Sequence, residues 1–231
     1  MSTWPQPSPP PAVPLVGRHV TLEPLHVGSD LEELIAAIAR PETFALGWGG
    51  GPEAYSDDPA VMDAFLRGYL PGLRDAGLSY LVRLNDDALF DVSPSDPGRR
   101  GRCVGTTSVG EFEPAKERCH LGWTAYSREV WGTVVNPECK RLLLGHVFDH
   151  GWGRVRIQAD ARNDRSQRAI AGIGATFEGI TRRDQRRADG SWRDAAVYSV
   201  IVDEWPAVRS RLSARVADRD AVRSAGEASL G

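Results

Sequence analysis

"WGTVVNPECKRLL", residues 131–143, is the stretch that decides the fold. A glycine and three β-branched residues precede the "NPE" triplet, and a run with helical spacing follows it. Asn136 is a favoured helix N-cap, Pro137 fits a first turn because its missing N–H costs nothing there, and Glu138 suits the positive end of the helix dipole. We predict a strand, a tight loop and a helix beginning at Asn136. Two interpretations stay open: the loop is a clean structural turn, or its free N–H groups hold an anion.

Composition restricts the class of protein. The chain has 231 residues, enough for one sizeable domain, and its formal net charge of −3 does not favour broad attraction to nucleic acid or membranes. No uninterrupted apolar run approaches the length of a membrane span. Cys103, Cys119 and Cys139 show neither C-x-x-C pairing nor the spacing of metal ligands. We therefore expect reduced, buried thiols, no metal site and a cytoplasmic location.

The two ends of the chain differ in composition from the middle. Residues 1–14 are rich in proline and lack the basic and apolar regions of a signal peptide, so we predict an extended, flexible lead-in. Residues 217–231 are polar, and we predict that this tail is disordered. The predicted domain therefore spans residues 15–216.

Hydrophobic periodicity between these ends predicts strands that alternate with helices. The segments with strand patterns are 19–25, 79–84, 102–112, 119–126, 154–160, 175–182 and 195–202. The segments with helical spacing are 29–42, 59–77 with a break before Pro71, 136–150, 163–174 and 203–216. The 136–150 helix is expected to bury a stripe formed by Cys139, Leu142, Leu143 and Val147. Six or seven strands with four or five helices indicate a single α/β or α+β domain.

Six motifs follow one another along the chain at a recognisable spacing. They are "GRCVGTTSV" (101–109), "HLGWTAY" (120–126), "WGTVVNPECKRLLLGHVFDHG" (131–151), "RVRIQADARNDRSQRAIAGIGATFEGITR" (154–182), "DGSWRD" (189–194) and "YSVIVDEWP" (198–206). Their combination resembles the GCN5-related N-acetyltransferase (GNAT) family, and within it the RimJ/RimL branch of ribosomal-protein N-terminal acetyltransferases. The resemblance covers residues 15–216. It implies a central twisted mixed sheet that splays between its fourth and fifth strands, with acetyl-coenzyme A entering the gap.

The resemblance also implies which residues hold coenzyme A. Backbone N–H groups near Thr124 and Ala125 would hold the thioester oxygen, and Asn163 would contact the pantetheine arm while capping a helix. Valine at 134 departs from the family pattern, which usually has a second glycine there, and Glu129 stands where Gln or Arg is usual. The pyrophosphate would bind the loop formed by Trp131, Gly132, Thr133, Val134, Val135 and Asn136, with Thr133 and Asn136 as possible side-chain donors.

Acetyl transfer to an amine requires a base for the ammonium, donors for the oxyanion and an acid for the thiolate. Ser166, the serine of an Asn-x-x-Ser pattern, is the candidate acid, and the alternative is an ordinary serine of the helix capping region. His120 and Glu111 are rival candidate bases, each with the alternative of a surface group. The resemblance implies a glutamate base after the sixth strand, but Gln185 stands there; neighbouring Asp184 is a weak substitute, so a water chain is a further option.

The sequence indicates fewer residues for binding the acetyl acceptor than for binding coenzyme A. Trp48, in the turn-rich loop 47–59, is the candidate wall of the acceptor pocket. The resemblance implies an acetyl-CoA-dependent N-acetyltransferase that acts by direct attack in a ternary complex. The acceptor would be a protein N-terminus, a lysine or a small-molecule amine, and the chain would be a monomer or homodimer without nucleic-acid or membrane partners. A non-catalytic acyl-CoA-binding or regulatory module on the same fold is the alternative.

Overall fold

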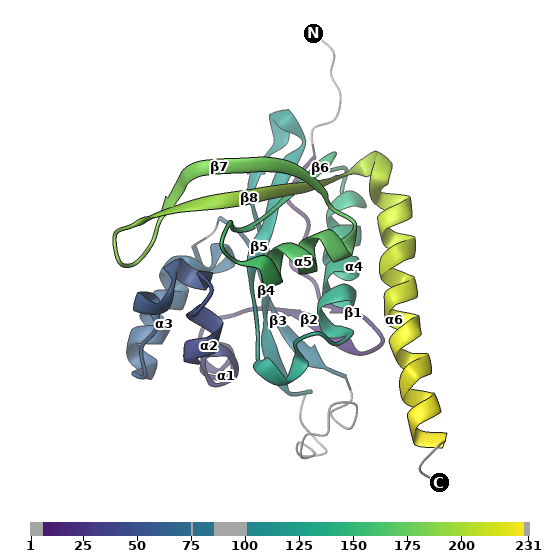
Figure 1. Cartoon of the computed structure of the whole chain (residues 1–231), viewed down its shortest axis with the longest axis horizontal. Coiled ribbons are helices and arrows are strands. Elements are labelled where there is room, and N and C mark those ends of the chain that lie inside the picture. Colours follow the sequence, from purple (N-terminus) through teal and green to yellow (C-terminus); the bar gives the residue numbers. More distant parts are fainter. Residues whose placement is uncertain (1–6, 75, 86–100, 229–231) are drawn as a thin grey trace.

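One eight-stranded mixed sheet runs through the molecule (Figure 1). The computed structural model describes residues 7–74, 76–85 and 101–228. The strand order is β1-β2-β3-β4-β5-β6-β8-β7. Every neighbouring pair is antiparallel except β5 with β6. The bounds are β1 Leu15–Val16, β2 Val20–Pro24, β3 Gly77–Leu84, β4 Cys103–Glu113, β5 Arg118–Tyr126, β6 Arg154–Asp160, β7 Thr176–Arg186 and β8 Trp192–Ile201.

The predicted single-domain α/β fold is confirmed, and the count of strands differs by one. Seven strands match the seven segments with strand patterns. The eighth, β1, has two residues, which is too short for any periodicity to reveal.

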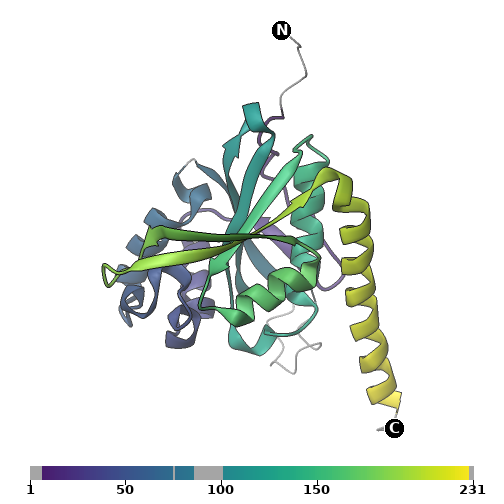
Figure 2. The same cartoon turned by 45° about the horizontal axis from the view of Figure 1, so that its top comes forward.

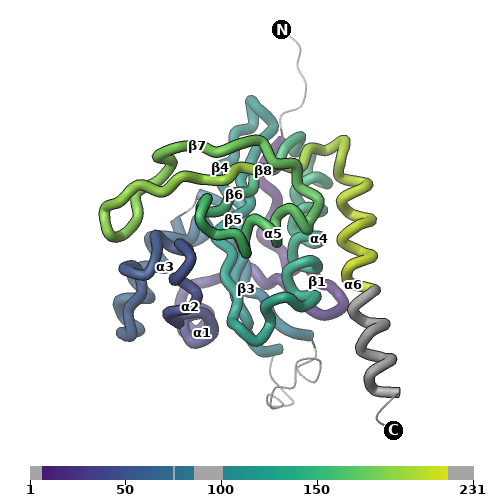
Figure 3. The backbone as a smooth tube through the Cα atoms, viewed as in Figure 1, coloured from purple at the N-terminus to yellow at the C-terminus, as the bar shows by residue number. Residues whose placement is uncertain are grey.

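Helices cover both faces of the sheet (Figures 1 and 3). The hydrophobic residues of α4, α5 and α6 pack on one face, whereas those of α1 and α3 form a separate cluster on the other. The four-residue α2 was not predicted, because it is shorter than two helical turns. The bounds are α1 Ser29–Ile38, α2 Pro41–Phe44, α3 Pro59–Tyr69, α4 Val135–Phe148, α5 Asp164–Ile173 and α6 Trp205–Ala228.

The parallel pair β5 and β6 is joined over only a short length. Arg118, Cys119 and His120 pair with Arg154, Val155 and Arg156, and the two strands then diverge. These are the fourth and fifth of the strands predicted from sequence, so the expected splay is confirmed. On the far side of the gap, the β7–β8 hairpin reaches over the helices of the N-terminal half (Figures 1 and 2), and Ala188 N–H donates to the Gly50 carbonyl at 3.0 Å.

The start of α4 corrects the predicted cap. The helix begins at Val135 with Val134 at the cap position, so Asn136 lies inside the first turn and is not the N-cap. The Thr133 hydroxyl accepts the N–H of Val135 at 3.3 Å and so takes the place of the predicted cap. Pro137 still falls in the first turn, where its missing N–H costs no hydrogen bond.

The buried face of α4 also differs from the predicted stripe. Cys139, Leu143 and Val147 are buried as expected, while Leu144 is fully buried and Leu142 only in part. A real helix face is broader than an idealised stripe, and the long α6 covers its second edge.

The N-terminal lead-in contacts the body of the protein, and the C-terminal segment continues a helix. The Trp152 indole donates to the Ser8 carbonyl at 3.0 Å, and His146 Nε2 lies 2.9 Å from the Pro11 carbonyl, so residues 7–14 follow the end of α4. Residues 1–6 lie outside the described residues. Helix α6 passes position 216 without a break and reaches Ala228, so the predicted domain limit falls within a helix. Within the described residues, no helix has the length and apolarity to cross a membrane.

Candidate active site

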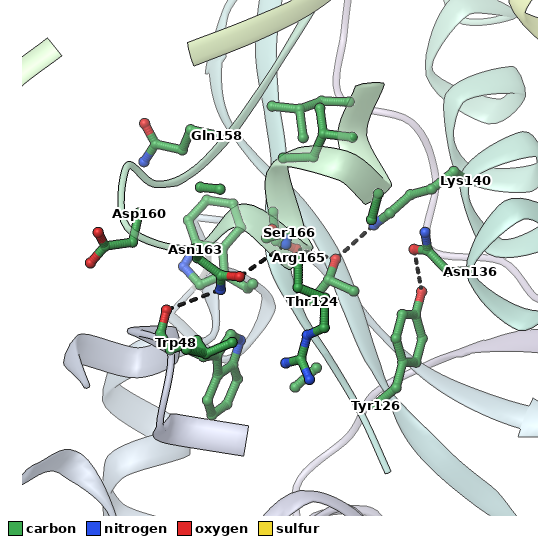
Figure 4. Close-up of a pocket in the computed structure, with 18 of the residues that line it drawn as sticks. Trp48, Thr124, Tyr126, Asn136, Lys140, Gln158, Asp160, Asn163, Arg165 and Ser166 are labelled. Atoms are coloured by element: carbon green, nitrogen blue, oxygen red, sulfur yellow. Dashed lines mark hydrogen bonds between the residues drawn. The ribbon is translucent and has the colours of Figure 1, made fainter. Parts of the chain in front are cut away.

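A cavity of about 480 Å³ occupies the gap between β5 and β6 (Figure 4). The start of α4, the start of α5 and the loop after α2 complete its wall. Ten of the thirteen residues proposed from sequence line it: Trp48, His120, Thr124, Ala125, Trp131, Gly132, Thr133, Asn136, Asn163 and Ser166. Glu111, Val134 and Val135 do not, and the two valine side chains are buried instead.

A β-bulge in β5 shapes the middle of the cavity. Thr106 pairs with Ala125 and Ser108 with Gly122, so two residues of β5 stand opposite Thr107 of β4. The extra residue is Trp123, which has a φ of 49°, a conformation that costs a side-chain-bearing residue about 1–2 kcal/mol. The bulge lies beside Thr124 and Ala125, where the resemblance placed the oxyanion donors.

A lysine that the sequence analysis did not single out lies under this bulge. Lys140 reaches from α4 and donates to the hydroxyls of Thr107 at 2.9 Å and Thr124 at 2.7 Å. Its side chain is buried, and burial lowers the pKa of its ammonium to about 8. Helical periodicity does not predict the burial of Lys140, because a lysine in the second turn of a surface helix is common.

The loop before α4 forms one end of the cavity. Gly132 has a φ of 74° and faces open space, which suits a close approach to a ligand. The Thr133 hydroxyl is already engaged within the loop, because it donates to the Val130 carbonyl at 2.7 Å. The indole of Trp131 donates to the Tyr126 carbonyl, and the Arg165 guanidinium lies 3.7 Å from the centre of its ring. A cation that the sequence analysis missed is thereby held at the mouth of the cavity.

The start of α5 confirms the predicted cap. The Asn163 amide oxygen accepts the N–H of Ser166 at 2.9 Å, and its amide nitrogen donates to the Leu46 carbonyl at 3.0 Å. Asn163 therefore holds α5 against the loop that carries Trp48. Ser166 supplies only its backbone N–H to the cap, and its side chain lines the cavity. The αL conformation of Gly174 ends α5 as predicted.

The two candidate bases lie next to each other. The Glu111 carboxylate is 3.3 Å from Nδ1 of His120 and 3.9 Å from the Arg156 guanidinium. The contact with His120 lowers the pKa of Glu111, so this carboxyl is ionised at neutral pH. His120 is buried beside Trp123, with 4.9 Å between ring centres; its Nδ1 faces Glu111, and its Nε2 has no hydrogen-bond partner in the described part of the chain.

An aromatic cluster forms the opposite end of the cavity. Trp48 packs against Phe44 at 5.1 Å and Tyr69 at 5.2 Å between ring centres. Gln185, which stands at the position of the expected glutamate base, lines the cavity and accepts from Arg193 at 2.9 Å. Its neighbour Asp184 pairs with Arg156 at 3.5 Å and is not among the cavity-lining residues.

The three cysteines are free and buried, as predicted. Burial raises the pKa of Cys103 to about 11 and those of Cys119 and Cys139 to about 12, so these side chains are neutral thiols at pH 7. Among the described residues, no group of three or more His, Cys, Asp and Glu side chains is arranged to hold a metal ion.

Comparisons with known proteins agree with this geometry. A family model described as "Acetyltransferase (GNAT) domain" matches residues 19–176. A solved acetyltransferase structure from T. thermophilus is 32% identical, covers 94% of this chain and 100% of that chain, and has a TM-score of 0.72. A GCN5-related N-acetyltransferase from Brucella melitensis is 25% identical over 92% of this chain and 89% of that chain, with a TM-score of 0.76.

Likeness of fold extends to the RimJ/RimL branch. Mycobacterium smegmatis RimJ in complex with CoA-disulfide is 20% identical, covers 87% of this chain and 90% of that chain, and has a TM-score of 0.64. No curated protein matches the chain. Because the family model spans well over half of the sequence and the splayed sheet agrees with it, the chain belongs to the GNAT family of acetyltransferases.

Proposed function

We propose that this chain is an N-acetyltransferase that moves the acetyl group of acetyl-CoA to a primary amine by direct attack in a ternary complex. The main support is the cavity in the gap between β5 and β6, which the α4 loop, the β5 bulge and the α5 cap all border. One cavity would thus join a helix start that binds the pyrophosphate to the site of thioester chemistry.

The α4 loop fits the pyrophosphate of coenzyme A. The first N–H groups of a helix have no intrahelical acceptor, and Gly132 leaves open space before them. Arg165 adds a positive charge at the same mouth. Valine in place of the second family glycine is no obstacle, because Val134 adopts an ordinary helical φ of −70°.

The remaining residues divide the chemistry between them. Backbone N–H groups beside the bulge, at Thr124 and Ala125, would hold the oxyanion, and Asn163 would orient the pantetheine arm. His120 would take the amine proton, with Glu111 orienting its ring. Trp48 would form an apolar wall for the acceptor.

An acceptor screen with acetyl-CoA tests the proposal. Peptides with free N-termini, lysine peptides, polyamines and amine-bearing antibiotics would each be supplied, and release of the coenzyme A thiol would be followed with the mass of the product. Solved structures described as ribosomal-protein acetyltransferases share the fold, which makes N-terminal peptides the first choice. Acceptor-dependent thiol release supports the proposal.

The non-catalytic alternative rests on one observation. Gln185 cannot accept a proton at the position of the expected glutamate base, and Arg193 holds it in place. Stoichiometric binding of acetyl-CoA with no turnover on any amine class would favour a binding module and contradict the proposed reaction.

A further inference from the structure

Lys140 is a buried cation whose partners are hydroxyl groups. Lys140 is only 4% exposed to solvent, and among the described residues no carboxylate forms an ion pair with its ammonium. Burying a charge without an opposite charge beside it is unfavourable, so the Lys140 ammonium lowers the free energy of unfolding. Arg83 and Arg187, whose side chains are 5% and 9% exposed, are both paired with carboxylates, at 2.6 Å and 2.5 Å. Lys140 thus departs from the way this protein handles other cations that are shielded from solvent.

The choice of lysine at this position is also unusual for the chain. Only 2 of its 28 basic residues are lysines, Lys116 and Lys140, and Lys116 is exposed. Arginine keeps its proton at any ordinary pH, whereas a lysine ammonium can give one up. A chain that uses arginine almost everywhere therefore has its one buried lysine beside the cavity.

One N–H donor of the Lys140 ammonium remains free beside the cavity. An ammonium has three N–H donors, and two of them go to Thr107 on β4 and Thr124 on β5. The third is left for the cavity, which Lys140 lines from the α4 side and Ser166 from the α5 side (Figure 4). The Thr124 hydroxyl lies within the β5 bulge, next to the backbone proposed to hold the thioester.

We propose that Lys140 is the catalytic acid that protonates the departing coenzyme A thiolate. The inference rests on the proposed acetyl transfer. The amine nitrogen forms a bond to the acetyl carbon, the carbon–sulfur bond breaks with its electron pair staying on sulfur, and Lys140 Nζ gives that sulfur a proton. Lys140 becomes a neutral amine and regains a proton from solvent, into which the attacking amine has released its own through His120.

The proton affinities of the two groups suit this transfer. Lys140 has a pKa of about 8, close to the value of about 8.5 that is typical of a thiol. The titratable group that acts on its charge is Cys139 on α4, whose thiol contacts Tyr126 on β5; burial raises the pKa of both Cys139 and Tyr126, so they stay neutral. Thr107 contacts Lys140 from β4, and Ser166 lines the same cavity from α5; neither side chain titrates in this range. Ser166 then acts as a hydrogen-bond donor beside the sulfur rather than as the proton source.

The first test is independent of the acceptor. The full chain is labelled with 13C at the lysine ε-carbon, which gives two NMR signals, and Lys116→Met assigns them. The Lys140 signal should titrate near pH 8. Adding coenzyme A should shift it, whereas desulfo-coenzyme A, which lacks the sulfur, should leave its titration unchanged. An equal response to both compounds would overturn the contact with sulfur, even if no acceptor has been found.

The second test uses an acceptor from the screen. Lys140→Met should lower kcat by about 10²–10⁴-fold, with the Kd for acetyl-CoA changed less than about 3-fold, and should abolish the fall in kcat above pH 8. Lys140→Arg, which keeps the charge but cannot transfer the proton, should not restore kcat. Lys116→Met is the matched control and should behave as wild type.

Three results would contradict the proposal. Wild-type kcat in Lys140→Arg would assign a fixed charge instead of an acid. Wild-type kcat in a folded Lys140→Met would leave only a structural role. Mass spectrometry that finds Lys140 itself acetylated during turnover would make it an acceptor. If Lys140→Met does not fold, Thr124→Val removes one of the two hydroxyl partners, and an unchanged pH profile in that variant would also count against the acid.

Discussion

The carboxylate of Glu111 lies 3.3 Å from Nδ1 of His120, so two residues that appear as rival bases in the sequence form one pair. They meet because Gly110 pairs with His120 across β4 and β5, and Glu111 follows with a φ of 52°. Only His120 borders the cavity. An ionised Glu111 is suited to orienting an imidazole, and the imidazole to receiving a proton from the substrate side.

His120→Gln should lower kcat/KM by about 10²–10⁴-fold, because it removes the proposed base. The decrease of kcat/KM at acid pH should disappear in this variant. Glu111→Gln should cause a smaller loss and keep that decrease. The pH dependence of kcat/KM measures both. Glu113→Gln is the matched control, since Glu113 is also a carboxylate at the end of β4 but pairs with Lys116 and Arg118 at the surface. A larger loss in Glu111→Gln than in His120→Gln would reverse the assignment.

The same contact predicts a dependence of folding stability on pH. The pKa of Glu111 is lowered in the folded state, so its contribution is present above the unfolded carboxyl value of about 4.3 and is lost as pH falls through the folded value. Because Glu111 is half exposed, solvent screening limits the effect to below about 1 kcal/mol. Thermal unfolding should find Glu111→Gln less stable than wild type at pH 7, with a deficit that shrinks as the pH falls below about 4.3. A deficit that does not change with pH would rule out the charge contact.

Replacing Gly132 tests the pyrophosphate site. Gly132→Val forces a β-branched residue to a φ of 74° and fills the open space before the first N–H groups of α4. The Kd for acetyl-CoA, measured by calorimetry, should rise at least about 10-fold, which corresponds to about 1.4 kcal/mol of binding free energy.

Gly190 offers a matched control for that substitution. It has a φ of 80° and open space around it, but it lies in the β7–β8 turn and does not border the cavity. Gly190→Val should therefore cost similar folding stability without weakening the binding of acetyl-CoA. Equal effects of the two variants on Kd would show that backbone strain alone explains the loss.

Glu138 ties α4 to the first strands of the sheet. Its fully buried carboxylate accepts the N–H groups of Arg18 and His19 at 2.8 Å and of Val20 at 3.2 Å. Glu138→Gln turns one acceptor into a donor that faces backbone donors, which should cost about 2–4 kcal/mol of the free energy of unfolding. Urea unfolding measures it, with Glu42→Gln at a position outside this network as control. A change below about 0.5 kcal/mol would contradict this role.

Features that depend on residues close together in the sequence could be predicted from it. Alternation and helical periodicity gave seven strands and five helices, and the Asn163 cap followed from residue type alone. The loop at 131–136 was located correctly although its cap residue was not: Thr133 and Asn136 are both good capping residues, and only the backbone path after Gly132 selects between them.

Features that depend on long-range contacts could not be read from the sequence. The sequence shows only that Glu138 is an acidic residue in the first turn of a helix, where the helix dipole favours it. Its hydrogen-bond partners, the N–H groups of Arg18 and His19, lie 120 and 119 positions away in the sequence. Lys140 meets Thr107 and Thr124 only because a bulge turns Thr124 toward α4. The pairing of Glu111 with His120 likewise requires the register of β4 and β5, which alternation does not determine.

Ser166 and Asn163 offer a test that separates catalysis from capping. The structure divides these tasks, because the cap oxygen comes from Asn163 while the Ser166 hydroxyl is left to the cavity. Asn163→Ala should destabilise the fold by about 1 kcal/mol and release the loop at Leu46, whose carbonyl it holds. Ser166→Ala should leave folding stability within about 0.5 kcal/mol. It should lower kcat with little change in the Kd for acetyl-CoA, because the proposed hydrogen bond from Ser166 to the sulfur would strengthen only as charge develops. Denaturant unfolding, calorimetry and steady-state kinetics on the two variants make the comparison. Should Ser166→Ala lose stability and keep kcat, its hydroxyl would belong to the helix start and not to the reaction.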